Sequence, residues 1–463
     1  MCSSAGATAA TTSLAPRWPS SSTTAAAAST SSSFSAALIF AAASAGVSSF
    51  FSGGGSWTTQ PAPSSRGRRD SSTPPVCQNS GVARFPAPAD FDVLIIGGGL
   101  AGVGAAWFLL EEGVAPARLG LLEAAGIGGS SDDGLLLELA EPYQRLRHAL
   151  GEKAPRLRRL ARRNRESLRA LAVMLRLEWD ERRGGALQLA ASAHEEAELR
   201  ASAAALERDG LALAFLEAPE AARALGAAHD CGGLFDPEGG CGDLRAWARG
   251  LAGVLAARGV HVQERCPATA LHAGAAGVEV ATPAGVARAQ RVILACGAGA
   301  PALDPGLSEL VAPARAQELV FPPLRERLLA PYVSRNHGAG RLHQDGAGRL
   351  HCAGLRHLDF DAEAGAEPRL NPRIQSGLER LARSFYPQLA SLEPELRLAR
   401  ARGHSCDGLP LAGRHPAREG VLLCLGFGDA AAVLALEAAR IVAALVVHGR
   451  APDADLMSPW RML

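Results

Sequence analysis

The sequence predicts an α/β fold in which a parallel sheet is assembled from segments that lie far apart in the chain. Three observations predict it. The apolar segment Phe91–Ile96 runs directly into GGGLAG at 97–102, and a helical stretch follows. Two later apolar segments, Arg291–Ala295 and Val421–Leu425, also end in glycine-rich turns. Short apolar runs of this kind suit strands that are buried on both faces of a sheet.

The first of these units has the order of a dinucleotide-binding βαβ motif. Gly97, Gly99 and Gly102 occupy the glycine positions of G-x-G-x-x-G, at the start of a helix predicted over Leu100–Glu112. These glycines allow a tight turn, a close approach of the backbone to a pyrophosphate, and close packing of the helix on the strand.

The start of that helix and the end of the next strand complete the predicted site. Leu100 and Ala101 carry free N–H groups at a helix N-terminus, where phosphate binds. The strand predicted at Arg118–Leu122 ends in Glu123, at the spacing from Gly102 where an acid bonds ribose hydroxyls. Together these features predict a Rossmann-like nucleotide-binding domain.

Later glycine turns favour FAD over NAD. The chain has one nucleotide-binding βαβ unit, and further strands that end in small-residue turns are expected to lie beside it, which suits a long cofactor. A small-residue loop follows Glu123, another turn follows the strand at 291–295, and a third precedes a long apolar helix predicted over Ala430–Val447. An NAD(P)-dependent dehydrogenase stays as an alternative. The predicted cofactor-facing residues of these turns are Gly128, Gly129, Ser130, Ser131, Ala295, Gly297, Gly426, Phe427, Gly428 and Asp429.

Composition excludes several other classes of protein. Lys153 is the only lysine, in a polar and arginine-rich stretch, which argues against pyridoxal and Schiff-base mechanisms. The net charge of +1 argues against a general nucleic-acid binder. The cysteines form no Cys-x-x-Cys and the histidines no ligand spacing, so we expect reduced thiols and no metal site.

The chain resembles the FAD-dependent oxidoreductases that include D-amino-acid oxidase, glycine oxidase, sarcosine oxidase and γ-glutamylputrescine oxidase. The resemblance covers residues 91–461. The segments that carry it are, in order, FDVLIIGGGLAG, LLEAAGIGGSS, GGLFDPEGGCGDLRAWARGLAGVLAARGVHV, RVILACGAG, LHCAGLRH and SCDGLPLAGRHPAREGVLLCLGFGDAA.

The resemblance implies a fold, a cofactor and an activity. It implies FAD bound by a discontinuous domain formed by 91–185, 230–305 and 400–463, with an interleaved β-rich substrate domain formed by 186–229 and 306–399. It places Gly426 and Gly428 beside the isoalloxazine ring. The implied activity is oxidation of a C–N bond in a small-molecule amine or amino acid, without a nucleic-acid partner.

The chain departs from the family's usual pattern at places expected to face the cofactor. Asp132 and Asp133 lie in the second glycine loop, and Asp429 follows the last glycine turn. Asp429 is predicted to be the N-cap of the following helix, yet its carboxylate would also repel a developing flavin anion. These acids leave open an alternative function, a flavin-binding but catalytically silent scaffold or assembly protein.

Three side chains are candidates for the substrate site. Arg356 follows a strand-like segment and could hold a carboxylate with two hydrogen bonds. Tyr332 is one of three tyrosines, and His404 precedes the DGLPLAG block. Structural roles for all three stay open. A separate arginine run at 156–165 predicts a solvated basic face of an amphipathic helix, with a docking surface for an acidic partner as the alternative.

The first 90 residues are predicted to lie outside the fold. Residues 1–70 are rich in Ser, Thr and Ala and carry no acid before Asp70, which is typical of an organelle transit peptide. We expect a chloroplast rather than a mitochondrial destination, with 71–90 as a linker. The apolar run Phe34–Phe51 keeps a secretory segment or a weak membrane span as a minority alternative.

Overall fold

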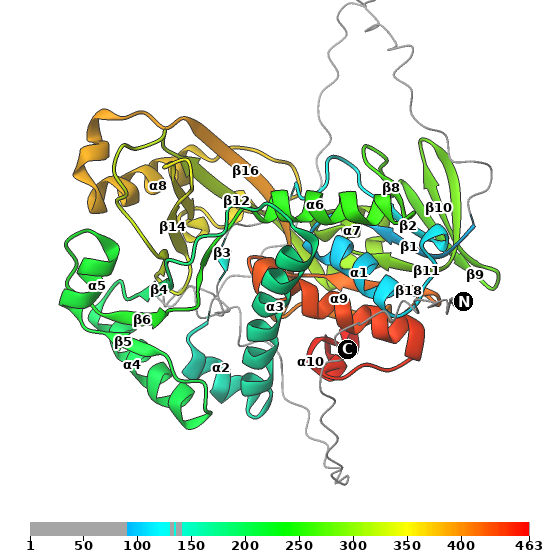
Figure 1. Ribbon diagram of the computed structural model, residues 1–463, viewed down its shortest axis with the longest axis horizontal. Helices are drawn as coiled ribbons and strands as arrows, with labels where there is room; N and C mark the ends of the chain where they lie inside the picture. Colours follow the sequence, from blue (N-terminus) through cyan, green and yellow to red (C-terminus); the bar gives the residue numbers. More distant parts are fainter. Residues whose placement is uncertain (1–89, 130–133, 136–140, 463) are drawn as a thin grey trace, which may run out of the picture. The chain divides into compact units, whose positions relative to one another are not determined.

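The computed structural model describes residues 90–129, 134–135 and 141–462. Within that part of the chain, two mixed β-sheets of eight strands each carry the fold, with helices packed on both (Figure 1). The predicted mixed α/β class is therefore confirmed. The predicted transit peptide and linker lie outside the described residues except for Asp90, as do Ser130, Ser131, Asp132 and Asp133.

The first sheet joins strands from three distant parts of the chain. Figure 1 shows β1 beside β11 and β11 beside β18, although more than a hundred residues separate each pair. β1 pairs in parallel with β2 and β11, and β11 pairs in parallel with β18. The order is β17 (Leu411–Arg414), β18 (Val421–Leu425), β11 (Gly285–Leu294), β1 (Asp90–Ile96), β2 (Leu119–Leu122) and β8 (His261–Gln263). In addition, β10 (Gly277–Thr282) pairs antiparallel with β11, and β9 (Ala270–Gly274) pairs antiparallel with β10.

Helices pack on this sheet and on one another through their buried apolar side chains. The helices of this group are α1 (Leu100–Glu111), α3 (Lys153–Leu175), α6 (Leu244–Ala257) and α9 (Ala431–His448). α1 is buried from Leu100 to Leu109, and a Cβ on Gly104 would lie 2.7 Å from a methyl group of Leu436 in α9. α9 is long and apolar enough to cross a membrane, but most of it is buried inside the protein, as in a core helix.

The second sheet separates an apolar face from a polar face. Leu342 and Cys352 pack on one face with Ile374 and Leu378 of α8 (Pro372–Phe385). Arg341, one residue before Leu342, lies on the opposite face because side chains alternate along a strand. The order is β16 (Leu396–Ser405), β12 (Val311–Val320), β15 (Leu350–Gly354), β14 (Gly340–Gln344), β13 (Tyr332–Arg335), β4 (Ala186–Leu189), β6 (Gly233–Asp236) and β5 (Ala214–Leu216).

The remaining elements are short or cover the edges of this sheet. They are β3 (Gly134–Leu135), which pairs with β7 (Gly240–Cys241), and the helices α2 (Tyr143–Leu150), α4 (Ala193–Arg208), α5 (Ala218–Leu225), α7 (Ala300–Leu303) and α10 (Ala454–Met457). β6 lies inside the range predicted for the FAD domain, yet it pairs with β4 and β5 in the second sheet.

The solvated basic face predicted for the arginine run in α3 is confirmed only for part of the run, since Arg159 and Arg162 are exposed. Arg158 and Arg165 are buried, and Arg165 forms an ion pair of 2.6 Å with buried Asp236. Arg156 contacts Asp453 and Asp455, and Arg163 contacts buried Glu437 of α9. The prediction missed these contacts because the acids lie 71 to 299 residues away in the sequence.

Candidate active site

The first glycine turn has space for no side chain at two of its three motif positions. Gly97 has φ +113°, and a Cβ there would lie 2.4 Å from the carbonyl oxygen of Ala295. A Cβ on Gly102 would lie 1.8 Å from the carbonyl oxygen of Gly97. α1 therefore starts directly against the end of β1. Its N-cap, Gly99, provides no side-chain cap and its first turn contains no acid, which leaves the N-terminus suited to an anion.

Glu123 lies at the end of β2, where the sequence predicts the ribose contact. Its Oε2 accepts the Gly98 N–H at 2.7 Å, and its Oε1 accepts the Ala125 N–H at 2.8 Å. The side chain is half-buried, and each carboxylate oxygen can accept a second hydrogen bond. The geometry thus orients Glu123 rigidly beside the first glycine turn.

The second small-residue loop folds back onto the first turn. The Gly128 N–H donates to the carbonyl of Gly98 at 3.0 Å. Gly128 has φ +78°, and a Cβ there would lie 2.9 Å from the carbonyl oxygen of Arg245, so this position also requires glycine. Gly129 is exposed next to it. Two stretches of backbone therefore meet at the carboxyl end of β1.

The two later turns lie at the carboxyl ends of the neighbouring parallel strands. The Ala295 N–H donates to Ile96 at 2.8 Å, which ties the turn after β11 to the end of β1. Gly297 has φ +52° and lies against Gly403 of β16. A Cβ built on Gly403 would lie 2.8 Å from the carbonyl carbon of Gly297. In open α/β sheets ligands bind at this edge, so the positions of Ala295 and Gly297 are compatible with the predicted cofactor contact, which stays a prediction.

The last glycine turn connects the two sheets. The Gly428 N–H donates to the Gly403 carbonyl at 2.8 Å, and Phe427 forms a β-bridge with His404. Gly428 has φ +51°, and a Cβ there would lie 2.4 Å from Nδ1 of His404. The turn between β18 and α9 is therefore held directly against β16 of the second sheet.

The sequence predicted Asp429 to be the N-cap of the helix after the last glycine turn, and this prediction is wrong. The helix starts at Ala431 with Ala430 as its N-cap and no side-chain cap. The Asp429 carboxylate turns instead to the polar face of the second sheet, where Oδ1 contacts Arg402 at 2.9 Å and Arg341 at 3.2 Å. Burial alone would raise the pKa of Asp429, but these guanidinium groups hold it well below its ordinary value.

His404 and Arg356 form a pair next to this cluster. Nη1 of Arg356 donates to Nε2 of His404 at 2.6 Å, and burial lowers the pKa of His404 to about 4. His404 is therefore neutral at pH 7 and uses the lone pair of Nε2 to hold the arginine. The Arg356 guanidinium also lies over the ring of Phe360, with 5.7 Å between them.

Tyr332 belongs to a stack of rings on the same face of the second sheet. It is buried and lies 5.5 Å from the ring of His343, which in turn lies 4.5 Å from the ring of His351. The structure thus brings Arg356 and His404 together with Asp429, and it places Tyr332 in a neighbouring row of the same polar face.

A comparison with known families decides the class of this protein. The sequence model of the family described as FAD dependent oxidoreductase, DAO, matches residues 92–445. This chain belongs to the FAD-dependent oxidoreductase family. The resemblance to the amino-acid oxidases seen in the sequence is confirmed, and FAD is the cofactor of this family.

Solved structures of similar proteins share the fold. Glycine oxidase from Geobacillus kaustophilus has a TM-score of 0.67 at 21% identity, covering 80% of this chain and 97% of the other. L-proline dehydrogenase from P. horikoshii has a TM-score of 0.68 at 16% identity, covering 81% and 98%. Iminodiacetate oxidase from Chelativorans sp. BNC1 has a TM-score of 0.62 at 20% identity, covering 79% and 98%.

The residues of this chain fit FAD. The uncapped start of α1 and the glycine positions without space for a Cβ form a cradle for the pyrophosphate, and Glu123 is oriented beside them. Gly426 and Gly428 would lie along the flavin side at the start of α9, the place that the resemblance implies. Within the described residues, no group of three or more His, Cys, Asp or Glu side chains could hold a metal ion.

Sequence reasoning missed two arginines of the site. Arg341 and Arg402 contact Asp429 from β14 and β16, which are not neighbours in the sheet. A signal for them exists in the sequence, since RLH at 341–343 and RARGH at 400–404 place basic side chains at alternate positions of a strand. That alternation predicts one basic face, but the sequence does not show that the face meets Asp429.

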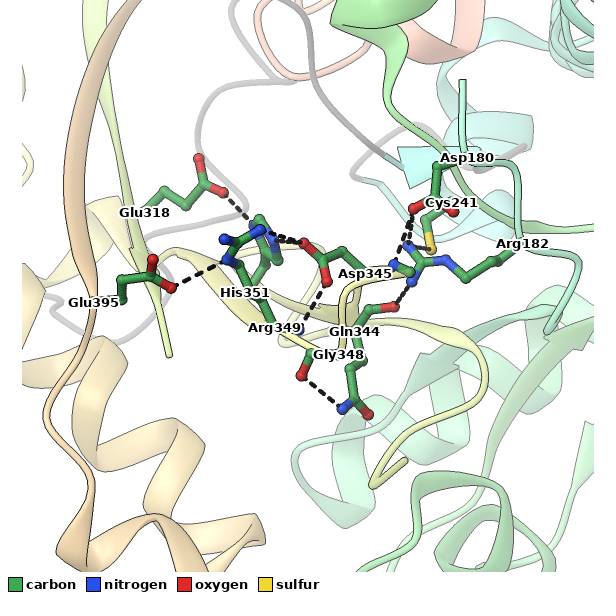
Figure 2. Close-up of polar contacts among 11 residues, drawn as sticks. Asp180, Arg182, Cys241, Glu318, Gln344, Asp345, Gly348, Arg349, His351 and Glu395 are labelled. Carbon is green, nitrogen blue, oxygen red and sulfur yellow. Dashed lines mark hydrogen bonds and ion pairs between the residues drawn. The ribbon is translucent and has the colours of Figure 1, made fainter. Parts of the chain in front are cut away.

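A second polar network extends this face away from Asp429. Figure 2 shows His351 between Glu318 and Asp345, with Nδ1 2.8 Å from Glu318 and Nε2 3.3 Å from Asp345. Burial alone would raise the pKa of Glu318, but His351 and Arg400 hold it well below its usual range. In the same figure Arg182 donates to the backbone carbonyl of Gln344. These contacts fix the strands that carry Arg341 and His343.

Proposed function

We propose that this member of the family oxidises a C–N single bond in a small-molecule amine or amino acid. FAD would accept the hydride from the carbon that bears the nitrogen, and the imine product would then be hydrolysed by water. The names of similar solved structures support this class of reaction, since they include oxidases and dehydrogenases of glycine, iminodiacetate and L-proline.

One observation carries the proposal. The Gly428 N–H donates to the Gly403 carbonyl, which holds the polar face of the second sheet against the turn at the start of α9. Arg402, His404 and Asp429 meet there. A substrate bound on this face would lie next to the flavin side of the cofactor site, and proximity and orientation are what the protein must supply for this chemistry.

Arg356 and His404 have different roles in this proposal. Arg356 is half-buried and orients the substrate. His404 positions Arg356 through its Nε2, rather than acting as a general base, because that lone pair already accepts a hydrogen bond. Substituting Arg356→Gln should therefore raise KM for the substrate, and His404→Gln should reproduce part of that change.

The silent-scaffold alternative is weakened by the contacts of Asp429. Its charge would oppose a developing flavin anion, but Arg341 and Arg402 lie within 3.2 Å of its carboxylate and offset part of that charge for groups that do not contact Asp429 directly. The acid is therefore compatible with catalysis, and the function proposed above is the one we favour.

The visible spectrum of the chain from residue 91 onward tests the proposed function. We expect the purified protein to be yellow, and its flavin absorbance to bleach when a suitable amine or amino acid is added without oxygen. A colourless protein would refute FAD binding. A yellow protein that no member of a broad amine and amino-acid panel bleaches would favour the silent alternative.

We also propose that the chain is delivered to the chloroplast, on the composition of residues 1–70. A fusion of residues 1–90 to a fluorescent protein should accumulate in plastids, and fluorescence in mitochondria or the secretory pathway would overturn this proposal.

A further inference from the structure

The polar face of the second sheet contains a position that is built for an anion. Arg341 and Arg402 extend from two strands that are separated by β12 and β15, and both contact one carboxylate oxygen. The strand neighbour of each arginine on this face is an alanine, Ala353 of β15 opposite Arg341 and Ala314 of β12 opposite Arg402, so neither guanidinium group is blocked by a large side chain at its own register position. Two guanidinium groups directed at one point form a carboxylate site.

The chain fills this position with its own carboxylate. Oδ1 of Asp429 lies 2.9 Å from Nη1 of Arg402 and 3.2 Å from Nη2 of Arg341. Asp429 is fixed there by its backbone, because the preceding residue, Gly428, donates to Gly403 of the same sheet. The contact is therefore part of the fold of the turn that meets the flavin side.

The carboxylate is the most accessible of the three charged groups in this ion-pair cluster. The Asp429 side chain is 35% exposed, whereas the side chains of Arg341 and Arg402 are 8% and 9% exposed. A ligand that approaches from the turn at the start of α9 therefore meets the carboxylate before it meets either guanidinium group. A second carboxylate in contact with Asp429 is disfavoured, because it would have to share the two guanidinium groups that Asp429 already occupies and would be repelled by the like charge.

We propose that Asp429 determines the specificity of the site by occupying the anion position, so that the substrate is an amine without a free carboxylate on the reacting carbon. The group of the substrate that lies beside Asp429 is then neutral or cationic. This inference rests on the proposed amine oxidation for its substrate class, but the occupation of the anion position can be tested without turnover.

Pairs of substrates that differ only in charge test the substrate class. Glycine and glycinamide form one pair, and sarcosine and sarcosinamide form another. The holoenzyme should reduce its flavin with a higher kcat/KM for each amide than for the matching acid. In the variant Asp429→Asn, the ratio of kcat/KM for the acid to kcat/KM for the matching amide should rise by about tenfold or more, because removing one adjacent like charge changes a binding equilibrium on that scale.

Binding of acetate and acetamide gives a readout that needs no reaction. The flavin absorbance change should report acetate binding that is about tenfold tighter in Asp429→Asn than in the unmodified holoenzyme, with acetamide binding unchanged. Asp304→Asn is the matched control, because Asp304 also forms ion pairs, with Arg418 and His415, away from this turn. Asp429→Glu keeps the charge and should keep the preference for amides.

Three results would overturn the inference: wild-type protein that oxidises the acids as well as the amides, an acid-to-amide ratio that Asp429→Asn does not move, or acetate binding equal in both proteins. If no compound reduces the flavin, the proposed oxidation fails while the acetate titration still decides the role of Asp429. If Asp429→Asn does not fold, the wild-type substrate pairs and Asp429→Glu decide it.

Discussion

The contact between Gly102 and Gly97 makes a quantitative prediction about one added methyl group. Gly102 lies in the first turn of α1, and a Cβ on it would lie 1.8 Å from the carbonyl oxygen of Gly97. A carbon and a carbonyl oxygen normally stay about 3.3 Å or more apart. Gly102→Ala must therefore move the start of α1 by about 1.5 Å, a displacement that breaks hydrogen bonds to a phosphate held by its N–H groups.

The expected effect on stability follows from two opposing terms. Forced overpacking costs about 1–3 kcal/mol, and the higher helix propensity of alanine returns about 1 kcal/mol. The affinity for FAD should fall by about tenfold or more, since a hydrogen bond to a charged group contributes about 1.5–3 kcal/mol. Denaturant unfolding of the apoprotein and titration with FAD measure the two effects separately.

Gly253→Ala is the matched control for this prediction. Gly253 is an exposed residue inside α6, and nothing lies within 4 Å of a Cβ built on it. The same chemical change should stabilise the protein there by about 0.5–1 kcal/mol and leave FAD binding unchanged. If Gly102→Ala binds FAD as tightly as Gly253→Ala does, the nucleotide site does not depend on the packing described above.

Three further predictions concern other parts of the site and its support. Glu123→Gln should weaken FAD binding about tenfold or more, because an amide cannot accept from both Gly98 and Ala125, whereas Glu112→Gln on the exposed end of α1 should leave it unchanged in the same titration. Burial lowers the pKa of His404 to about 4, so between about pH 6.5 and 4 the unfolded chain binds more protons than the folded protein. The free energy of unfolding should therefore fall by about 3 kcal/mol as the pH is lowered across that window. In acid titrations of stability, His404→Gln should remove this loss. Asp236→Ala leaves buried Arg165 without its ion pair and should destabilise the protein by about 3–5 kcal/mol in urea unfolding, and a similar midpoint in both proteins would contradict this account.

Local patterns in the sequence predicted most of the nucleotide-binding part. The strand at Phe91–Ile96 and the helix from Leu100 are confirmed within two residues, because glycine spacing and apolar runs are set by neighbouring residues. Asp243 is the N-cap of α6, and its side chain accepts from the Ala246 N–H at 2.8 Å, a contact between near neighbours in the sequence. These features need no knowledge of the rest of the chain.

The errors concern charges whose partners are distant in the sequence. Asp429 has the local pattern of an N-cap, but two arginines from another sheet stabilise it elsewhere more strongly. Three arginines of α3, Arg156, Arg163 and Arg165, have the pattern of a solvated face, but their partners come from α10, α9 and β6. Long charged side chains reach across elements, so local periodicity could not predict these contacts.

The order of strands in the first sheet affects how the protein is made. β1 has neighbours on both sides, β2 and β11, and β11 needs β18, which ends at Leu425 near the C-terminus. During synthesis the chain therefore emerges for more than 300 residues after β1 before the sheet can close. We expect an incomplete chain to expose β1 and α1 to chaperones, and we expect cofactor loading to follow the synthesis of β18.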